Sequence, residues 1–329
     1  MDFIQKRSRL RLVLPCLICI AIFYTIAVRN SNNLRILLSR WSYPMKSIIS
    51  VEEFCYSSDS DSFLRDHLRQ PVINTIVNQS IYINPADAAK HTIISSNFTN
   101  LSDFIVHLRS ALLSRRLEPG SRSIPVIFHR PPYKDMVKPL CDGLWMEFGV
   151  FQGATLTLIA DWKSTYCNHT NQLVYGFDTF TGLPTDWRPS FGRGSFNIGN
   201  GTKFNVPKNA VLIKGLFIDT LPVHLRMIDS QYKCHTPVSF VHIDCDIYDG
   251  ARDVLFLLSS RFVKGTIIVF DELFNYPTFE KHEIKAFYEL LASANIRLIP
   301  LGTSTNIELN PTQDLPVQTF GFVVASYQA

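Results

Sequence analysis

Residues 240–250, FVHIDCDIYDG, form the stretch on which the predicted fold and the predicted site both depend. It begins as an apolar run of strand length and ends in two acids one residue apart, Asp244 and Asp246. A continuous apolar strand is typical of a parallel sheet that is covered on both faces. Carboxylate oxygens are the ligands that hard divalent cations prefer. The stretch therefore predicts a buried strand whose end holds a metal ion.

Short apolar runs alternate with amphipathic segments on both sides of this stretch. The runs predict strands at 144–148, 173–177, 210–214, 238–243, 265–270, 296–300 and 320–326. The amphipathic segments predict helices near 152–162, 219–227, 251–261 and 279–294. This alternation indicates an α/β fold with a doubly wound, mostly parallel sheet. Ligands of such sheets bind at the carboxyl ends of the strands, so the residues that follow each run are the informative ones.

The ends of the first two predicted strands favour a cofactor site. Glu147 ends the first run, and Gly149 and Gly153 bracket the turn that follows it. The fingerprint G-x-G-x-x-G is not met, because Phe151 takes its second glycine position. Asp178 ends the second run, where an acid can accept hydrogen bonds from the ribose hydroxyls of an adenosine group. The alternatives are a tightly packed turn and an acid that caps a turn or helix.

The ends of the fourth and fifth predicted strands favour a metal site. Asp271 and Glu272 follow the fifth run, and adjacent parallel strands would bring them to Asp244. Three such carboxylates suit Mg²⁺ with positions left for a substrate. Without a cation, three unpaired buried acids would cost several kcal/mol through desolvation and repulsion. The alternative is that Asp246 or Glu272 only caps a helix.

Residues 140–295 resemble the macrocin O-methyltransferase family. The resemblance rests on the strings EFGVFQGATL, VYGFDTFTGLP, KGLFIDTLP, FVHIDCDIYDGARDVLFLLSSRFVKGTIIVFDEL and NYPTFEKHEIKAFYELL. It implies a class I, Rossmann-like methyltransferase fold with seven strands, the last antiparallel. It also implies a bound S-adenosylmethionine and Mg²⁺, with sugar hydroxyls as acceptors. The metal positions match Asp244, Asp271 and Glu272, and the cofactor positions match Glu147, Gly149, Gly153 and Asp178. Glu272 stands where the family has an aspartate, so its ligand role is the less secure.

Two residues are candidate general bases for such a reaction. A sugar hydroxyl is a poor nucleophile at neutral pH, so a base must remove its proton. Asp246 is one candidate and His282, on a predicted helix, is the other. Residues 185–208 form a long glycine-rich loop of the kind that covers a substrate.

The N-terminal part predicts a membrane anchor. Residues 12–28, LVLPCLICIAIFYTIAV, carry no charge and are flanked by basic residues, which indicates an uncleaved signal-anchor, or alternatively a cleaved signal peptide. The expected order is a cytoplasmic tail (1–11), the anchor (12–28), a lumenal stem with a helical preface (29–135) and the methyltransferase domain (136–329). The preface helix lies in NLSDFIVHLRSALLSRRLEPG, with apolar residues on one face, a cap at Ser102 or Asn100 and a stop at Gly120. It should pack against the domain.

Sequons and cysteines favour a type II protein with a lumenal body, in the Golgi or the ER. N-x-S/T sequons occur at Asn78, Asn97, Asn100, Asn168 and Asn200. Five cysteines lie beyond the anchor, so at least one of them cannot form a disulfide within the chain. We predict that Cys245, which lies between the two acids, is the free one. The other four, Cys55, Cys141, Cys167 and Cys234, can pair in three ways.

Charge excludes a nucleic-acid partner. Seven of the 32 basic residues lie in the first forty residues, against one of the 28 acidic ones, so the remaining chain is slightly acidic. The expected acceptor is a glycan. Whether the chain forms a homo-oligomer is left open by the sequence. A Golgi glycosyltransferase with a D-x-D motif at Asp244 and Asp246 is the alternative enzyme, although it does not account for Asp271 and Glu272. A binding module with an inactive fold is a third alternative, which the retained acids disfavour.

Overall fold

A computed structural model of the chain describes residues 98–115, 140–167, 173–199, 206–232, 235–294 and 296–327. The predicted tail, the anchor and most of the stem lie outside these residues, as do four of the five sequons, at Asn78, Asn97, Asn168 and Asn200. Among the described residues, no helix has both the length and the apolar character needed to cross a membrane.

The centre of the protein is a seven-stranded sheet in the order β3-β2-β1-β4-β5-β7-β6. Its strands are β1 (Leu144–Phe148), β2 (Val174–Asp178), β3 (Ala210–Lys214), β4 (Val238–Ile243), β5 (Phe262–Phe270), β6 (Ile296–Pro300) and β7 (Phe320–Tyr327). Neighbouring strands from β3 to β5 run parallel, whereas β7 runs antiparallel to both β5 and β6. The expected doubly wound sheet with an antiparallel last strand is therefore confirmed.

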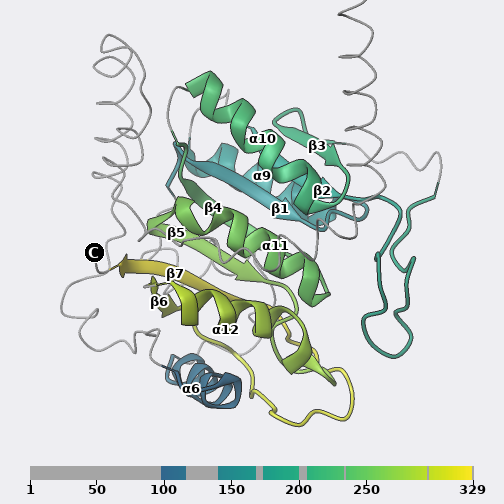
Figure 1. The fold of residues 1–329 in the computed structure, drawn as a ribbon, viewed down its shortest axis with the longest axis vertical. Coiled ribbons are helices and arrows are strands. Elements are labelled where there is room, and N and C mark those ends of the chain that lie inside the picture. The colour runs from purple at the N-terminus through teal and green to yellow at the C-terminus, as the bar shows by residue number, and fades with distance from the viewer. Residues whose placement is uncertain are drawn as a thin grey trace, which may run out of the picture. The chain divides into compact units, whose positions relative to one another are not determined.

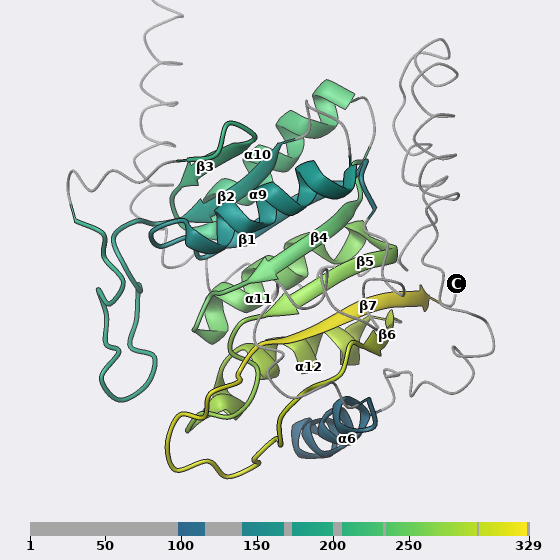
Figure 2. The ribbon, with the colours of Figure 1, turned by 180° about the vertical axis from the view of Figure 1, so that it is seen from behind.

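Helices cover both faces of this sheet. They are α9 (Ala154–Cys167), α10 (Phe217–Tyr232), α11 (Tyr248–Leu258) and α12 (Glu283–Ser293), with short 3-10 turns η1 (Ser259–Arg261) and η2 (Phe279–Lys281). Helices α10, α11 and α12 lie on the face seen in Figure 1, and α9 lies on the face seen in Figure 2. Since both faces are covered, the central strands β1 and β4 are buried at every position.

The predicted elements agree with the observed ones to within a few residues, with one division. The helix expected at 279–294 is split into η2 and α12 at His282, whose backbone (φ −115°, ψ −128°) is not helical. Thr278, just before this segment, takes the left-handed region at φ 69°, so the segment begins with a turn rather than with a regular helix. Strand β5 begins at Phe262, three residues before the predicted start, because Gly265 continues the strand at φ +101° beneath Leu140.

Aromatic and aliphatic side chains fill both sides of the sheet. On the α9 face, the rings of Trp145 and Phe240 stack at 5.2 Å between centroids. On the other face, Phe287 of α12 packs against Phe270 and Phe322 at 4.7 and 5.1 Å. These buried rings hold β1, β4, β5 and β7 in fixed register, so the ends of the strands are fixed as well.

The preface helix α6 (Leu101–Leu113) packs against the domain, as expected. Asn100 caps its start by accepting the Asp103 N–H at 2.9 Å. Phe104 meets Phe287 of α12 at 5.7 Å between ring centroids. Arg109 Nε donates to the Ile307 carbonyl at 2.7 Å. The helix therefore belongs to the same packed body as the sheet.

One disulfide lies among the described cysteines and selects between the pairings left open. Cys141, just before β1, is bonded to Cys167 at the end of α9. Cys245 is free and buried, as predicted.

The turn after β1 lies directly against the end of β4. Gly149 takes φ +94°, and a Cβ placed on it would come within 1.8 Å of the Asp244 carbonyl oxygen. Only glycine permits this approach, because any side chain would collide with the backbone of β4. The predicted cofactor turn and the first predicted metal ligand are therefore in direct contact.

We predict that Gly149→Ala lowers the free energy of unfolding by about 3 kcal/mol, because strain at positive φ and the collision with Asp244 add together. Urea denaturation followed by circular dichroism measures this. Gly194→Ala is the matched control, since Gly194 has φ +85° but nothing within 4 Å of an added Cβ. It should cost only about 1 kcal/mol. Equal losses in the two variants would contradict the proposed close packing.

Candidate active site

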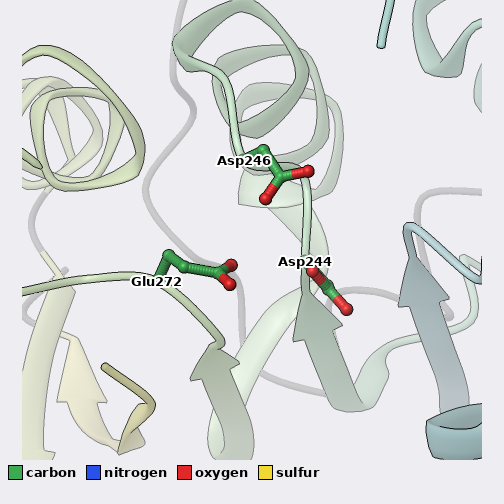
Figure 3. A group of neighbouring side chains, drawn as sticks. All are labelled: Asp244, Asp246 and Glu272. Atoms are coloured by element: carbon green, nitrogen blue, oxygen red, sulfur yellow. The ribbon is translucent and has the colours of Figure 1, made fainter. Parts of the chain in front are cut away.

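Three carboxylates meet where β4 and β5 end. One ligand oxygen each from Asp244, Asp246 and Glu272 lies within 4.8 Å of the others. Figure 3 shows Glu272 reaching from the loop after β5 toward the two aspartates that follow β4. The parallel pairing of β4 with β5 brings these residues together, since Asp271 N–H donates to the Ile243 carbonyl at 2.9 Å.

Charge in this cluster is poorly balanced by the protein alone. Burial, and then the charge of Asp271, raise the pKa of Asp244 and of Glu272 well above their usual values. Glu272 Oε2 is buried without a hydrogen-bond partner. Such an orphaned carboxylate oxygen is costly unless a proton or a cation meets it. The cluster therefore fits a hard divalent cation such as Mg²⁺.

Asp271 lies beside the cluster rather than in it. Its Oδ1 accepts the Thr319 hydroxyl at 3.0 Å and lies 3.6 Å from His242 Nε2. The predicted metal set and the observed cluster thus share Asp244 and Glu272 and differ in the third member. The physical reason is that the Thr319 hydroxyl donates to Oδ1 of Asp271 and the buried His242 ring attracts the same oxygen, which turns it away from the cluster. The side chain stays one third exposed, so Oδ2 is still available to a ligand.

Asp246 does not serve as a helix cap. Helix α11 begins at Tyr248 after Ile247, and no side chain caps it. Asp246 is instead held at φ +62°, a region that is rare for a residue other than glycine. The buried Glu283 supports this conformation, because its Oε1 accepts the Cys245 N–H at 3.0 Å. Strained residues of this kind concentrate at functional sites.

Beneath the cluster lies a residue that sequence reasoning missed, His242. It pairs in register with Glu147 across β1 and β4, and its Nδ1 lies 3.0 Å from Glu147 Oε1. Its ring is fully buried. Although burial opposes the charge, Asp271 and Glu147 raise the pKa of His242 well above its ordinary value. Alternation along the strand, which places His242 and Asp244 on one side, was the signal that could have found it.

Glu147 does not face the solvent. Its side chain is fully buried, its Oε1 contacts His242, and its Oε2 has no hydrogen-bond partner. Burial raises its pKa, and the contact with His242 offsets part of that rise. A ligand at the strand ends would therefore contact the turn after β1 and not the side chain of Glu147. Its role in cofactor binding stays a prediction.

Asp178 has two tasks at the end of β2. Its Oδ2 accepts the N–H groups of Val150 and Phe151 at 2.8 Å each, and its Oδ1 accepts that of Phe180 at 2.6 Å. These bonds hold the turn that contains Gly149 and Gly153, so Asp178 fixes the shape of the turn. A carboxylate has about four acceptor positions, which leaves one for a ribose hydroxyl. The arrangement fits an adenosine group at this edge, with one hydrogen bond rather than two.

The loop after β2 lies against the start of α12. Trp187 contacts His282 and Tyr276, with ring centroids 6.5 and 5.7 Å apart. The Arg188 guanidinium lies 3.7 Å above the Trp187 ring and pairs with Asp314 at 3.1 Å. Burial, and then the charges of Lys281 and Arg188, lower the pKa of His282 to about 4. His282 is therefore neutral at pH 7 and faces an aromatic group of the loop.

Asn275 is a second residue that sequence reasoning missed. It is fully buried, and its side chain donates to the carbonyls of Asn306 and Val317 and accepts the N–H of Glu308. These bonds anchor the loop that carries Glu272 to the segment between β6 and β7. Nothing in the sequence signals this role, because all its partners lie more than thirty residues away.

No protein-family model matches the chain, and no curated protein matches it. Among solved structures, the crystal structure of CalS11, described as a calicheamicin methyltransferase, has 20% identity and a TM-score of 0.41, covering 84% of this chain and 96% of that one. The apo structure of CalS11, described as a TDP-rhamnose 3′-O-methyltransferase, has 21% identity and a TM-score of 0.37, covering 81% and 97%. The structure of the O-methyltransferase NovP has 15% identity and a TM-score of 0.36, covering 56% and 72%. Similarities this distant assign no activity, so the function proposed below rests on the site.

We predict that the metal-free protein loses stability as the pH rises through the acid range because of Asp246. Burial raises its pKa to about 7, with Asp271 adding to the rise and Arg188 opposing it. Unfolding returns the pKa to about 3.9, so between these values the folded state holds a proton that the unfolded state has lost. The contribution of Asp246 therefore declines from about pH 4 to pH 7. Calorimetric melting temperatures from pH 4 to 8 measure it.

Asp246→Asn should flatten this pH dependence, and Mg²⁺ should weaken it in the unchanged protein, since the cation favours the ionised carboxylate. Asp161→Asn, an exposed acid on α9 away from the cluster, is the control and should leave the curve as it is. A pH profile that is the same with and without Asp246 would contradict the prediction.

Proposed function

We propose that this chain is an S-adenosylmethionine-dependent, Mg²⁺-assisted O-methyltransferase that methylates a sugar hydroxyl of glycans in the secretory pathway. The observation that carries the proposal is the contact between the glycine turn after β1 and Asp244 of the acid cluster. This contact supports an adenosine site and a cation site that adjoin each other at the carboxyl ends of the strands. The resemblance to the macrocin O-methyltransferase family supports the same assignment.

The residues assigned to the cofactor are Gly149, Gly153 and Asp178, with Glu147 beneath them. Gly153 takes φ +80° and ends the turn, and Asp178 accepts the amides of that turn. The turn is thus shaped before any ligand arrives, which reduces the entropy lost on binding. Methyl transfer is an in-line displacement, so holding donor and acceptor in line supplies much of the rate enhancement.

The acid cluster would serve the acceptor. A Mg²⁺ ion held by Asp244, Glu272 and either Asp246 or Asp271 would lower the pKa of a coordinated hydroxyl. The protein's part is to fix the carboxylates, and it does so through Asn275 below Glu272 and Glu283 below Cys245. A sugar with two neighbouring hydroxyls would present two oxygens to such a site.

Asp246 fits the role of general base better than His282. A base must lie within reach of the proton that it removes, and a carboxylate oxygen of Asp246 lies within 4.8 Å of those of Asp244 and Glu272, whereas the ring of His282 packs against Trp187 of the loop. In this assignment Asp271 is the third metal ligand through Oδ2, and Asp246 takes the proton. His282 then lines the acceptor site together with Trp187.

The location of the reaction is proposed from different observations. The uncharged segment 12–28, the sequons and the disulfide between Cys141 and Cys167 all agree with a lumenal body behind a type II anchor in the Golgi or ER. A glycan acceptor follows from this location combined with sugar methylation. A glycosyltransferase remains the alternative enzyme, but it offers no role for the turn held by Asp178.

We predict that S-adenosylhomocysteine raises the melting temperature of the full chain and that a sugar nucleotide does not. Ligand bound at one hundred times its dissociation constant stabilises the folded state by about 2.7 kcal/mol. Differential scanning fluorimetry detects this shift, and transfer of a labelled methyl group to a glycan panel tests the reaction. Stabilisation by UDP-sugars alone would favour the glycosyltransferase. Methylation of phenols but of no glycan would refute the acceptor class.

We predict that Asp246→Asn and Asp271→Asn lose methyltransferase activity for different reasons. If Asp246 is the base, its variant loses 10²- to 10⁴-fold in kcat while Mg²⁺ binds as before. If Asp271 is a ligand, its variant binds Mg²⁺ more weakly and recovers part of its activity at high Mg²⁺ concentration. Isothermal titration calorimetry and steady-state kinetics separate these outcomes. The reverse pattern would make Asp246 the ligand, in line with the cluster geometry.

A further inference from the structure

His242 has a carboxylate beside each of its two ring nitrogens. Nδ1 lies 3.0 Å from Oε1 of Glu147 on β1, and Nε2 lies 3.6 Å from Oδ1 of Asp271 after β5. The three side chains therefore join strands β1, β4 and β5 beneath the site. None of them is needed merely to fill the core, and an apolar residue at position 242 would avoid the cost of burying a charged group.

The ring is confined by its packing, so it has little room to move toward Glu147 or toward Asp271 separately. It is fully buried, and its strand is buried on both faces. An imidazole is rigid, so a rotation that shortens one of the two contacts changes the other. Packed interiors do not absorb such changes by continuous deformation. A shift at Glu147 would therefore change the position of the ring relative to Asp271.

Both ends of this connection touch groups assigned to ligands. Glu147 lies two residues before Gly149, whose turn is the candidate cofactor site and rests against the Asp244 carbonyl. Asp271 Oδ1 accepts the Thr319 hydroxyl and lies 3.6 Å from His242 Nε2, at ion-pair distance, which leaves Oδ2 for the cation. Residues that hold a metal-binding carboxylate in place typically contribute 10- to 100-fold to metal affinity.

We propose that His242 is a positioning residue that couples cofactor binding to metal binding: by bridging Glu147 and Asp271, it makes each ligand bind more tightly when the other is present. This inference rests on the proposed function and adds to it an energetic link between the two halves of the site. By reciprocity, the factor by which Mg²⁺ tightens cofactor binding equals the factor by which cofactor tightens Mg²⁺ binding.

The first experiment needs no substitution. Isothermal titration calorimetry on the full chain measures the affinity for S-adenosylhomocysteine with and without saturating Mg²⁺, and the affinity for Mg²⁺ with and without S-adenosylhomocysteine. We expect both to tighten by about tenfold, within the usual range for coupled sites. S-adenosylhomocysteine carries no sulfonium charge, so direct repulsion between the methyl donor and the cation does not enter the measurement.

Two substitutions then divide the bridge into its halves. In His242→Asn, the amide nitrogen takes the place of Nδ1, so the contact with Glu147 is kept and that with Asp271 is lost. In His242→Gln, the amide reaches the place of Nε2, so the contact with Asp271 is kept and that with Glu147 is lost. We expect His242→Asn to weaken Mg²⁺ binding 10- to 100-fold while the metal-free affinity for S-adenosylhomocysteine stays unchanged. We expect His242→Gln to retain Mg²⁺ affinity but to lose the coupling.

Thr319→Val is the matched control. It removes the other donor to Asp271 Oδ1 without touching His242, so Mg²⁺ binding should weaken while the coupling factor stays as in the unchanged protein. A merely structural role for His242 would lower both affinities and the melting temperature together, with no difference between Asn and Gln.

Each outcome bears on the inference or on the function separately. If both ligands bind to the unchanged protein independently of each other, the coupling is refuted and the proposed function stands. If His242→Gln keeps the full coupling, the contact between Gly149 and Asp244 carries it and the role of His242 is refuted. If neither ligand binds to the unchanged protein, the proposed function itself fails. Should both histidine variants fail to fold, the measurement on the unchanged protein still decides whether coupling exists.

Discussion

The site depends on how negative charge is balanced at the carboxyl ends of β4 and β5. Asp244, Asp246 and Glu272 come within 4.8 Å of one another, and Asp271 lies beside them. Carboxylates at such distances cannot all be ionised in a buried setting unless positive charge is near. The protein supplies some of it from below, through His242, and some from the loop, through Arg188. The negative charge that stays unbalanced is the charge that a divalent cation would neutralise.

Because the unbalanced carboxylates repel one another, several contacts are needed to hold the backbone and side chains around them in place. Gly149 lets the turn after β1 pack against the Asp244 backbone, and Asn275 anchors the loop that carries Glu272. Glu283 accepts the Cys245 N–H between the two aspartates, where the backbone of Asp246 is strained. Repelling side chains would otherwise move apart on the flexible ends of strands. Each anchor is a backbone contact or a buried side chain, so the cluster persists at the expense of local strain.

The topology and the location of the site could be predicted from the sequence, because both follow from short-range patterns. Continuous apolar runs predict buried parallel strands, and parallel strands bring the residues after them to one edge. The orientation of each acidic side chain at this edge could not be predicted. Thr319, which holds Asp271 Oδ1, comes from 48 residues further along the chain. The partner of His242 depends on the register of β1 against β4, and no sequence pattern encodes that register.

The two interpretations left open for Asp178 prove to be compatible. The sequence suggested either an acid for a ribose or an acid that stabilises a turn, and three backbone amides now bond to it while one acceptor position is spare. A carboxylate with several acceptor positions can shape a turn and bind a ligand beside it.

Helix α6 has a practical consequence for anyone who dissects the chain. Its Phe104 covers Phe287 and Tyr288 of α12, and Arg109 and Arg115 reach carbonyls at Ile307 and Pro300. A truncated protein that starts at residue 136 would leave those rings in water and those carbonyls without their donors. Exposed aromatic surface of this kind promotes association between copies. Insolubility of such a fragment would reflect the missing helix rather than an unstable sheet.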